Sequence, residues 1–275
     1  MRQWNALGKF EVKIKKQKQA RHLQCFVPMS IGRRIVLATL LTVTAKVATA
    51  ASVSVLFVGN SLTQVNDLPT VFKEFAAEST LHVEVETSAI TPGGAFLYDH
   101  WKQGQAVAML REKHPNFLVL QGQSTEPVSA PESFLHCARL FKAESDRVGA
   151  TTILFATWAR PAGDPYYKDP KSGGSPAAMQ AGLNSAYASA AENIGATLAP
   201  VGVAFERAQK DSPKIRLLDG TQHPTPAGTY LAAAVLFRVV FNTDSAESAY
   251  YGSLPRETAL RLQRVADEIL ISSSR

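Results

Sequence analysis

The chain has 275 residues, of which 45% are hydrophobic and 19% are charged, a composition and length that suit one large globular domain or two small ones. The net charge is +6, but ten of the 29 basic residues and only one of the 23 acidic residues lie in residues 1–50. That segment has a net charge of +9 and residues 51–275 have −3, so the body of the chain offers no electrostatic case for nucleic-acid binding.

The basic N-terminal segment ends in a predicted signal peptide, Met29–Ala50. Arg33 and Arg34 precede a largely apolar run over residues 35–45, and the segment closes on the A-x-A cleavage pattern Ala48-Thr49-Ala50. The run of eleven residues is well short of the roughly 20 that a membrane-spanning helix needs. We therefore expect export to the periplasm or the medium, without stable membrane insertion after cleavage. The alternative is an N-terminal membrane anchor.

Two domain-level expectations follow from this leader. Residues 1–28 form an extension before the signal, either a start-site artefact or a long basic region, and residues 51–275 form the mature domain. Of the two cysteines, Cys25 lies in the leader, and Cys137 lies in an apolar-periodic stretch where a buried structural role is expected. The mature domain is thus expected to have no internal disulfide, so its stability must come from its core.

The body alternates β-rich runs with helical patterns. Predicted strands cover 52–58, 82–88, 116–121, 151–158 and, weakly, 196–202, and predicted helices cover 67–79, 95–113, 131–149, 177–195, 225–241 and 255–271. Asp67 and Thr225 are expected N-caps, and Gly149 and Gly195 are expected to end their helices. A Pro/Gly-rich loop is expected over 159–176.

This alternation predicts an α/β fold with a parallel sheet and helices on both faces. The strands are apolar throughout, as strands buried on both faces are. Ligands of such sheets bind beyond the carboxyl ends of the strands. The residues that directly follow each predicted strand are therefore the first candidates for a functional site.

Ser61 follows the first predicted strand across a Gly-Asn turn. Gly59 permits a sharp bend of the backbone after the strand. A serine exposed at the carboxyl end of a strand, near backbone N–H groups, has the position that a nucleophile needs. The alternative is that Asn60 or Ser61 only caps the next helix.

His223 and Asp219 form a second candidate pair, in the stretch DGTQHPTPAG before the helix at 225–241. Because Pro224 follows it, His223 is expected to be extended on a loop. A histidine that reaches a serine hydroxyl through one ring nitrogen, with an acid at the other, is the logic of a catalytic triad. The alternative is an ordinary surface histidine.

Oxyanion donors and substrate contacts are expected from the loops after the other strands. Gly93 and Gly94 could present a backbone N–H, and Gln121 and Gln123 could supply a side-chain amide. Arg160 could bind a substrate carboxylate or line the mouth of the site, or be a solvated loop residue. The substrate-binding candidates are Asn60, Arg160 and Trp158.

Other catalytic motifs are missing from the sequence. It contains no G-x-S-x-G nucleophile elbow, no phosphate-binding loop, no G-x-G-x-x-G, no H-E-x-x-H and no Cys/His cluster with zinc spacing.

Together these stretches resemble the SGNH (GDSL-like) hydrolase family. VLFVGNSLT is similar to its first block, TPGGAFLYDHW to its second, VLQGQS stands at its third, and DGTQHPTPAGTYLAA resembles its last, in the family's order over residues 53–240. The resemblance implies a three-layer α/β/α, flavodoxin-like fold with a five-stranded parallel sheet, and no metal or organic cofactor. It also implies Ser61 as nucleophile, His223 as base, Asp219 as its orienting acid, and Ser61, Gly94 and Gln123 as oxyanion donors.

The sequence departs from the family pattern at two places. The third block lacks its asparagine, so Gln123, with Gln121 second, is the candidate for that donor. The Asp–His spacing is one residue longer than usual, and a Ser–His dyad oriented by a backbone carbonyl is the alternative if Asp219 cannot reach the ring.

The expected function is hydrolysis of carboxylic esters through an acyl-serine, with short acyl groups and O-acetylated carbohydrates as the expected substrate class. One alternative is a non-catalytic carbohydrate-binding protein that stacks sugars on Trp158, Tyr166 and Tyr167. Another is an acyltransferase that uses the same serine.

Overall fold

The computed structural model describes residues 52–81, 83–211 and 213–272 of the chain. These residues belong to one compact unit, Ala48–Arg275. The predicted signal peptide and its cleavage site lie outside the described residues.

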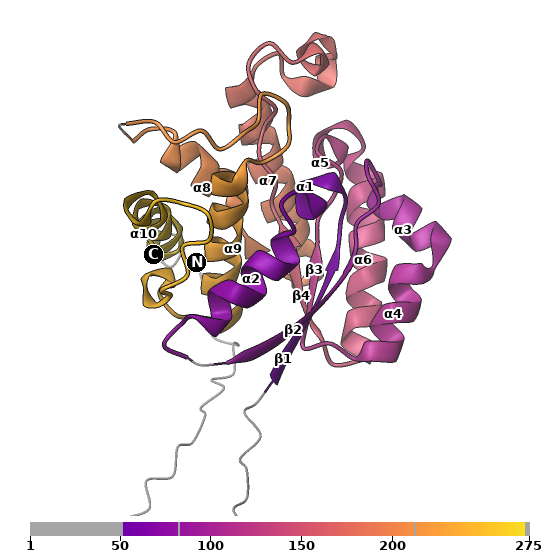
Figure 1. Ribbon diagram of the computed structural model, residues 1–275. Helices are drawn as coiled ribbons and strands as arrows, with labels where there is room; N and C mark the ends of the chain where they lie inside the picture. The colour runs from indigo at the N-terminus through magenta and orange to yellow at the C-terminus, as the bar shows by residue number, and fades with distance from the viewer. Residues whose placement is uncertain (1–51, 82, 212, 273–275) are drawn as a thin grey trace, which may run out of the picture. The chain divides into compact units, whose positions relative to one another are not determined.

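A five-stranded sheet forms the centre of this unit (Figure 1). Its strands are β1 (Ser52–Val58), β2 (Glu84–Ile90), β3 (Phe117–Leu120), β4 (Thr151–Phe155) and β5 (Thr197–Ala199). All neighbouring pairs are parallel, in the order β2-β1-β3-β4-β5, and Val58 is in register with Ile90 on one side and Leu120 on the other. This is the flavodoxin-like strand order, so the predicted parallel sheet is confirmed.

Helices connect the strands and cover the sheet. The α-helices are α1 (Ser61–Gln64), α2 (Leu68–Ala77), α3 (Leu97–Gln103), α4 (Gln105–Lys113), α5 (Glu126–Ser129), α6 (Pro131–Arg147), α7 (Pro176–Ile194), α8 (Val201–Ala208), α9 (Pro226–Phe241) and α10 (Arg256–Ser272). Three short 3-10 helices are η1 (Pro165–Lys168), η2 (Pro170–Ser172) and η3 (Ser245–Glu247).

Alternating side chains of each strand build two apolar layers, one on each face of the sheet. Val55 and Phe57 of β1 pack in the layer that contains α2, α8, α9 and α10. Leu56 and Val58 pack in the layer that contains α4, α6 and α7 together with Cys137, which is buried as expected. Figure 1 shows the two groups of helices on opposite sides of the sheet. The predicted three-layer α/β/α fold is confirmed.

Two predicted elements differ from the structure. The single helix expected over 95–113 is broken into α3 and α4, because Gly104 adopts a left-handed backbone with φ of 74°. The weak strand expected over 196–202 ends at Ala199. Pro200 is the N-cap of α8, a helix that the sequence pattern did not predict. Both differences lie away from the residues that follow β1.

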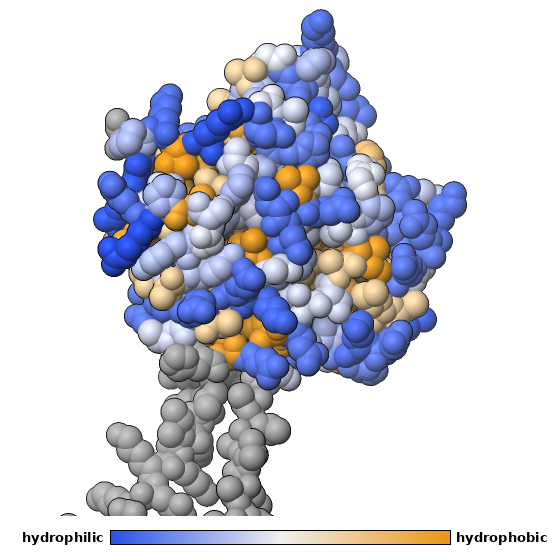
Figure 2. All heavy atoms as spheres, in the orientation of Figure 1, coloured by the Kyte–Doolittle hydropathy of each residue, from blue (hydrophilic) through white to orange (hydrophobic). Residues whose placement is uncertain are grey.

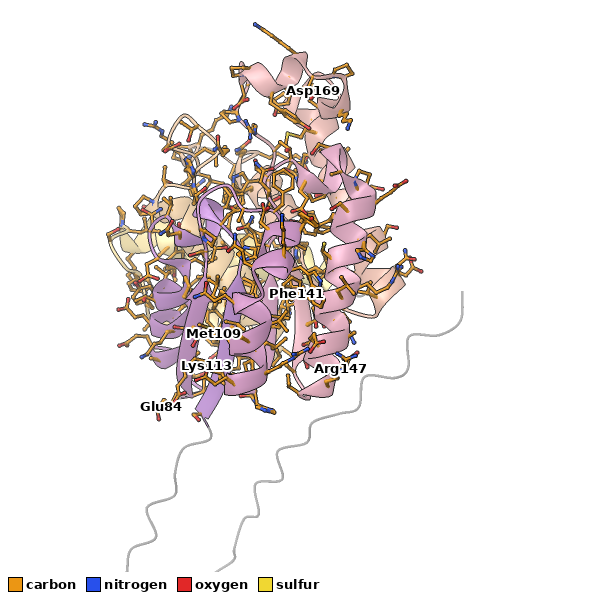
Figure 3. All side chains as sticks on the ribbon, turned by 90° about the vertical axis from the view of Figure 1, so that its right-hand side faces the viewer. Glu84, Met109, Lys113, Phe141, Arg147 and Asp169 are labelled. Carbon is orange, nitrogen blue, oxygen red and sulfur yellow. The ribbon has the colours of Figure 1, made fainter. Side chains whose placement is uncertain are left out.

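The carboxyl ends of the strands define one edge of the sheet, where α1 and α5 lie (Figure 1). In the view turned by 90°, Glu84 at the start of β2, Lys113 and Arg147 all lie toward the amino-terminal edge of the sheet, whereas Asp169 lies beyond the carboxyl edge (Figure 3). On the face drawn in Figure 2, hydrophobic residues form small groups between hydrophilic ones. Because ligands of parallel sheets bind beyond the carboxyl ends of the strands, the candidate site is expected at the edge with α1 and α5.

Candidate active site

The turn that leads from β1 into α1 is built for close packing. Gly59 has no space for a side chain, because an added Cβ would lie 2.7 Å from Gln121 Oε1 and 2.8 Å from Thr63 Oγ1. The Gly59 N–H donates to the Ile90 carbonyl at 3.1 Å, which ties the turn to β2. Ser61 is the first residue of α1, so its N–H has no acceptor within the helix and is free to face a ligand oxygen.

Asn60 is buried in this turn and bonded at both ends of its amide, and its contact with substrate stays a prediction. It is 2% exposed. Its Oδ1 accepts from the Leu62 N–H at 3.2 Å as the N-cap of α1, and its Nδ2 donates to the Ala95 carbonyl at 3.0 Å. Both ends of the amide are bonded in the interior. Asn60 thereby joins the turn at residues 59–61 to the loop that contains Gly94.

Ser61 and His223 meet at the carboxyl edge, although 162 positions separate them. The distance from Ser61 Oγ to His223 Nε2 is 3.0 Å, within hydrogen-bond range. A serine hydroxyl and an imidazole at this distance have the geometry of a nucleophile with its general base.

Thr221 lies between Asp219 and His223. Its Oγ1 is 3.0 Å from His223 Nδ1 and donates to Asp219 Oδ1 at 2.7 Å. Its backbone N–H also donates to Asp219 Oδ1 at 2.7 Å. These two bonds lower the pKa of Asp219, so the carboxyl is ionised at neutral pH. The imidazole of His223 is thus linked to the predicted acid through a hydroxyl.

The loop with His223 is held at both ends by backbone hydrogen bonds. Leu218 and Pro224 form an isolated antiparallel bridge, and the Asp219 N–H donates to the His223 carbonyl at 3.1 Å. Directly after it, Thr225 begins α9 as its N-cap, as predicted. Because α9 is buried along most of its length, the loop is attached to the core of the protein.

Trp158 packs beneath the surface and bonds this loop, and its predicted role in substrate binding stays a prediction. The side chain is 2% exposed and stacks on Phe205, with ring centroids 4.1 Å apart and planes at 2°. Its Nε1 donates to the Gln222 carbonyl at 2.9 Å. The indole thereby fixes the residue before His223.

The two glutamines of the third loop have different surroundings. Gln121 is 1% exposed, and its Oε1 accepts from the Asn60 N–H and from Thr63 Oγ1, each at 3.0 Å. Gln123 is half-buried, and its Oε1 accepts from the N–H and the hydroxyl of Thr125. These bonds orient Gln123 with its amide nitrogen as the remaining donor, and they make Gln121 a support for the turn at Asn60.

Gly94 lies in an exposed turn that the Ala95 N–H closes on the Pro92 carbonyl at 3.3 Å. Its φ of 73° is in the left-handed region, which favours glycine. Gly94 remains the predicted second oxyanion donor. Its loop is joined to the turn at residues 59–61 by the hydrogen bond from Asn60 Nδ2 to the Ala95 carbonyl.

Glu126 joins the same loops from inside and was not foreseen. It is fully buried, and its carboxyl accepts from the Gln123 N–H at 2.9 Å and from the Leu97 N–H at 3.2 Å. Burial raises the pKa of Glu126 to about 7, against the lowering effect of these two N–H groups. The signal in the sequence was weak, since a glutamate in a short loop is usually a solvated residue.

His100 is a second contributor that the sequence patterns did not indicate. It is 1% exposed, and its Nε2 is 2.7 Å from the Gly59 carbonyl, to which the ring N–H donates. Burial lowers the pKa of His100, so the ring is neutral near pH 7. His100 thereby fixes the backbone two residues before Ser61.

Arg160 lies beside the third loop and is largely occupied by protein partners. Its guanidinium donates to Ser124 Oγ at 3.1 Å and to Asp164 at 3.3 Å, and it lies 5.2 Å from the centroid of the Tyr166 ring. The position next to Ser124 is compatible with lining the mouth of the site, and its contact with substrate stays a prediction.

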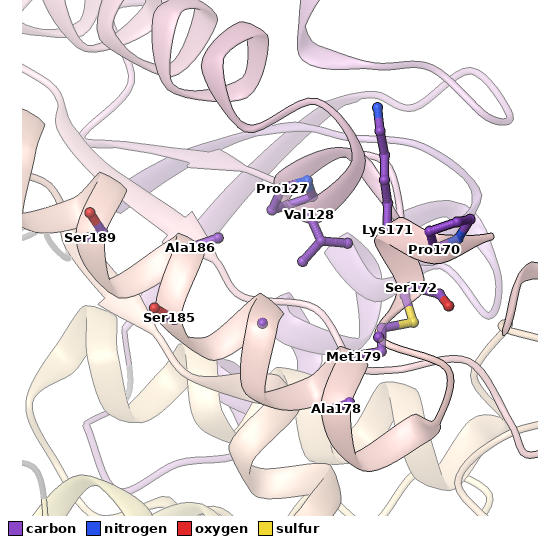
Figure 4. Close-up of a pocket in the computed structure, with 12 residues that line it drawn as sticks. Pro127, Val128, Pro170, Lys171, Ser172, Ala178, Met179, Ser185, Ala186 and Ser189 are labelled. Atoms are coloured by element: carbon purple, nitrogen blue, oxygen red, sulfur yellow. The ribbon is translucent and has the colours of Figure 1, made fainter.

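A pocket of about 540 Å³ lies elsewhere, between α5, η2 and α7 (Figure 4). Val128, Lys171 and Met179 are among its lining residues, and Ser61 and His223 are not. Within the part of the chain that the structure describes, no group of three His, Cys, Asp or Glu side chains is placed to hold a metal ion. No helix among the described residues is long and apolar enough to cross a membrane.

Comparison with solved structures identifies the family. A protein from Slackia heliotrinireducens assigned as an SGNH hydrolase is 30% identical, matches 69% of this chain and all of its own, and has a TM-score of 0.57. A DUF4886 family protein from Bacteroides uniformis is 16% identical over 82% of this chain and 97% of its own, with a TM-score of 0.67. An acetyl xylan esterase, AlAXEase, is 16% identical over 68% of this chain and all of its own, with a TM-score of 0.53.

No protein-family model matches the sequence, and no curated protein matches it. The identity and full coverage of the Slackia protein are sufficient to place the chain: it belongs to the SGNH (GDSL-like) hydrolase and esterase family. The prediction of an SGNH-type ester hydrolase is confirmed at the level of this family.

Proposed function

We propose that the protein is a serine esterase that cleaves short-chain carboxylic esters through an acyl-serine intermediate. The single observation that supports this most strongly is the 3.0 Å contact between Ser61 Oγ and His223 Nε2 at the carboxyl edge of the sheet. A cap residue has no need of an imidazole partner, whereas a nucleophile has.

The reaction then has two halves. His223 Nε2 takes the proton of Ser61 Oγ as the oxygen attacks the ester carbonyl, and the imidazolium returns that proton to the departing alkoxide. The C–O bond to the alcohol breaks and an acyl-serine remains. Water, deprotonated by His223, attacks this ester and releases the acid, and Ser61 recovers its proton.

The negative charge that develops on the carbonyl oxygen needs donors that are already in place. The Ser61 N–H, the Gly94 N–H and the Gln123 amide are the proposed donors. They lie on three loops that are joined by the hydrogen bonds of Asn60 and Glu126. Holding the donors on connected loops reduces the reorganisation required during the reaction.

For the substrate, we propose O-acetyl groups on carbohydrate. The support is associational: a neighbour in fold is an acetyl xylan esterase. Of the three aromatic residues on which the alternative sugar-binding function rests, Trp158 is buried, whereas Tyr166 and Tyr167 are half-buried. The burial of Trp158 favours the esterase over that alternative.

The test is release of p-nitrophenol from p-nitrophenyl acetate and butyrate by the wild-type chain, Ser61→Ala and His223→Ala. We expect both variants to lose roughly a thousand-fold or more of kcat while their circular dichroism spectra stay unchanged. A mass increase of one acetyl group on wild type, absent in Ser61→Ala, would identify the acyl-serine. An inert wild type, or a Ser61→Ala variant with undiminished rate, would contradict the proposal and favour a binding function.

A further inference from the structure

We propose that Thr221 is a positioning residue of the active site, whose hydroxyl connects Asp219 to His223 in place of a direct carboxylate–imidazole contact. The inference rests on the proposed esterase function. The observation behind it is the chain of contacts Asp219 Oδ1, Thr221 Oγ1, His223 Nδ1, with successive distances of 2.7 and 3.0 Å.

The directions of these hydrogen bonds follow from counting donors and acceptors. An ionised carboxylate can only accept, so the single hydroxyl proton of Thr221 goes to Asp219. The two lone pairs of Thr221 Oγ1 remain as acceptors. One accepts the backbone N–H of His223 at 3.2 Å, and the other is left for Nδ1.

This count fixes the tautomer of His223. Because Thr221 Oγ1 can only accept at Nδ1, that nitrogen must bear the ring proton. Nε2 is then unprotonated and accepts from Ser61 Oγ, as a general base must. When Nε2 takes the serine proton, Nδ1–H continues to donate to Thr221, so no second proton has to move.

The longer Asp–His spacing has a structural explanation in this arrangement. Asp219, Thr221 and His223 occur at alternate positions of a loop that the Asp219 N–H closes on the His223 carbonyl. The backbone N–H of Thr221 donates to the same carboxylate oxygen as its hydroxyl, which holds the Thr221 side chain between acid and base. The additional residue thus makes room for a hydroxyl in the chain of contacts.

The solvent exposure of Asp219 and Thr221 determines how large a loss of kcat we expect when either group is removed. Asp219 and Thr221 are exposed, whereas the Ser61–His223 contact is partly buried. Water screens the charge of an exposed carboxylate, so Asp219 should contribute less to the rate than a buried triad acid. We expect losses of roughly 10- to 100-fold for removal of either group, well below that of Ser61→Ala.

The kinetic experiment compares the full-length wild type with Thr221→Val, Thr221→Ser, Asp219→Asn and the double variant Asp219→Asn/Thr221→Val, on p-nitrophenyl acetate. Valine removes the hydroxyl and keeps the shape, and serine restores the hydroxyl. We expect Thr221→Val to lower kcat with little change in KM, Thr221→Ser to recover most of it, and the double variant to be no slower than the slower single variant.

A matched control is Thr80→Val. Thr80 is another exposed threonine whose hydroxyl donates to a carboxylate, Glu247, at 3.0 Å. It lies in the turn after α2, on a segment that contributes nothing to the site. Its variant should keep wild-type kcat, which separates a loss specific to Thr221 from the general cost of removing a surface hydroxyl.

A second readout does not depend on turnover. Long-range ¹H–¹⁵N correlation spectra of the imidazole, recorded where the ring is neutral, report which nitrogen is protonated. We expect the Nδ1–H form of His223 in wild type and Thr221→Ser, and a mixture or the Nε2–H form in Thr221→Val. Wild type with the Nε2–H form would overturn the inference, as would undiminished kcat in Thr221→Val.

The two proposals fail in different ways. If wild type cleaves no ester but shows the Thr221-dependent Nδ1–H form, the proposed function is wrong and the hydrogen-bond assignment stands. If wild type is active, Ser61→Ala is inactive and Thr221→Val matches wild type, the esterase proposal stands and the role of Thr221 is wrong.

Discussion

At the scale of single residues, the site depends on hydrogen bonds that point into the protein. Gln121 and His100 bond the backbone of Asn60 and Gly59, directly before Ser61, and are almost fully buried. The equally buried Asn60 side chain accepts from the Leu62 N–H after Ser61 and donates to the Ala95 carbonyl of the neighbouring loop. A buried polar group that loses its partner costs about 1–3 kcal/mol, so this turn has little freedom to adopt other arrangements. The backbone around Ser61, the proposed nucleophile, is therefore held in place by buried side chains.

Trp158 gives a prediction at this scale. Trp158→Phe keeps an aromatic ring against Phe205 but removes the N–H that donates to the Gln222 carbonyl. Because that bond fixes the loop with His223, we expect kcat to fall roughly ten-fold on every ester, as the loss of one hydrogen bond of about 1.4 kcal/mol would give. The measurement is kcat and KM on p-nitrophenyl acetate and on an acetylated xylo-oligosaccharide.

The two substrates distinguish this role from direct sugar binding. If Trp158 stacked on a sugar, the variant would raise KM for the oligosaccharide and leave the small ester unaffected. A selective KM effect of that kind would support the sequence-based prediction for Trp158. Thermal unfolding of the same variant controls for a general loss of packing.

At the scale of elements, the carboxyl of Glu126 connects the N-terminus of α3 with the loop before α5. Both acceptor oxygens face Leu97, and one also faces Gln123, inside the protein. These loops contain two of the proposed oxyanion donors. An acid in this place titrates near neutral pH, so its protonation is linked to stability.

The sign of that linkage can be worked out. Burial raises the pKa of Glu126 from 4.5 to about 7 in the folded protein, so the folded state binds this proton more tightly than the unfolded chain. Its stabilising contribution is complete below pH about 4.5 and is lost as the pH rises through about 7. A difference of this size corresponds to roughly 3 kcal/mol.

The prediction is that Glu126→Gln, which cannot titrate, loses less stability than wild type between pH 4.5 and 8, by roughly 3 kcal/mol. Urea unfolding of both proteins at a series of pH values measures it. His100, whose pKa burial lowers, contributes with the opposite sign, losing stability as the pH falls below 6.5, and is present in both proteins. Parallel pH curves for the two proteins would contradict the prediction.

At the scale of the whole molecule, the two apolar layers of the described residues close on the two faces of one sheet. Both apolar layers are built from β1 onward, and α9 provides a long buried stretch of one of them. The basic residues of the leader are absent from this part of the chain. The residues that give the chain its positive net charge are thus different from the residues that form the described core.

We therefore expect residues 51–275 alone to fold and to keep the esterase activity of the full chain. The melting temperature should change by less than about 3 °C, the shift that ~1 kcal/mol gives in a domain of this size. The net charge falls to −3, so the shortened chain should bind an anion exchanger at pH 8. Calorimetry and ion-exchange chromatography measure these outcomes, and an insoluble or unfolded product would contradict the expectation.

Much of the fold was predictable because its signals are local. Apolar strands, capped helices and their alternation are determined by neighbouring residues, and a parallel sheet then brings the carboxyl ends of all strands to one edge. That is why Ser61, directly after β1, could be placed at this edge. His223 precedes α9 and follows no strand, so the expectation that it faces Ser61 came from the logic of a triad and from the family resemblance. The break at Gly104 and the helix after Pro200 were missed because each depends on one residue within an otherwise continuous pattern.

Local patterns in the chain are therefore sufficient to predict the class of fold, the family resemblance and the residues that follow the strands. Which polar groups face inward, and what they bond, depends on the packed three-dimensional structure. Asn60 and Trp158 follow strands as substrate-binding residues would, yet both are buried. Thr221 is an ordinary loop residue by sequence, yet it lies between Asp219 and His223. Burial and hydrogen-bond direction depend on atoms from distant segments, and no local pattern encodes them.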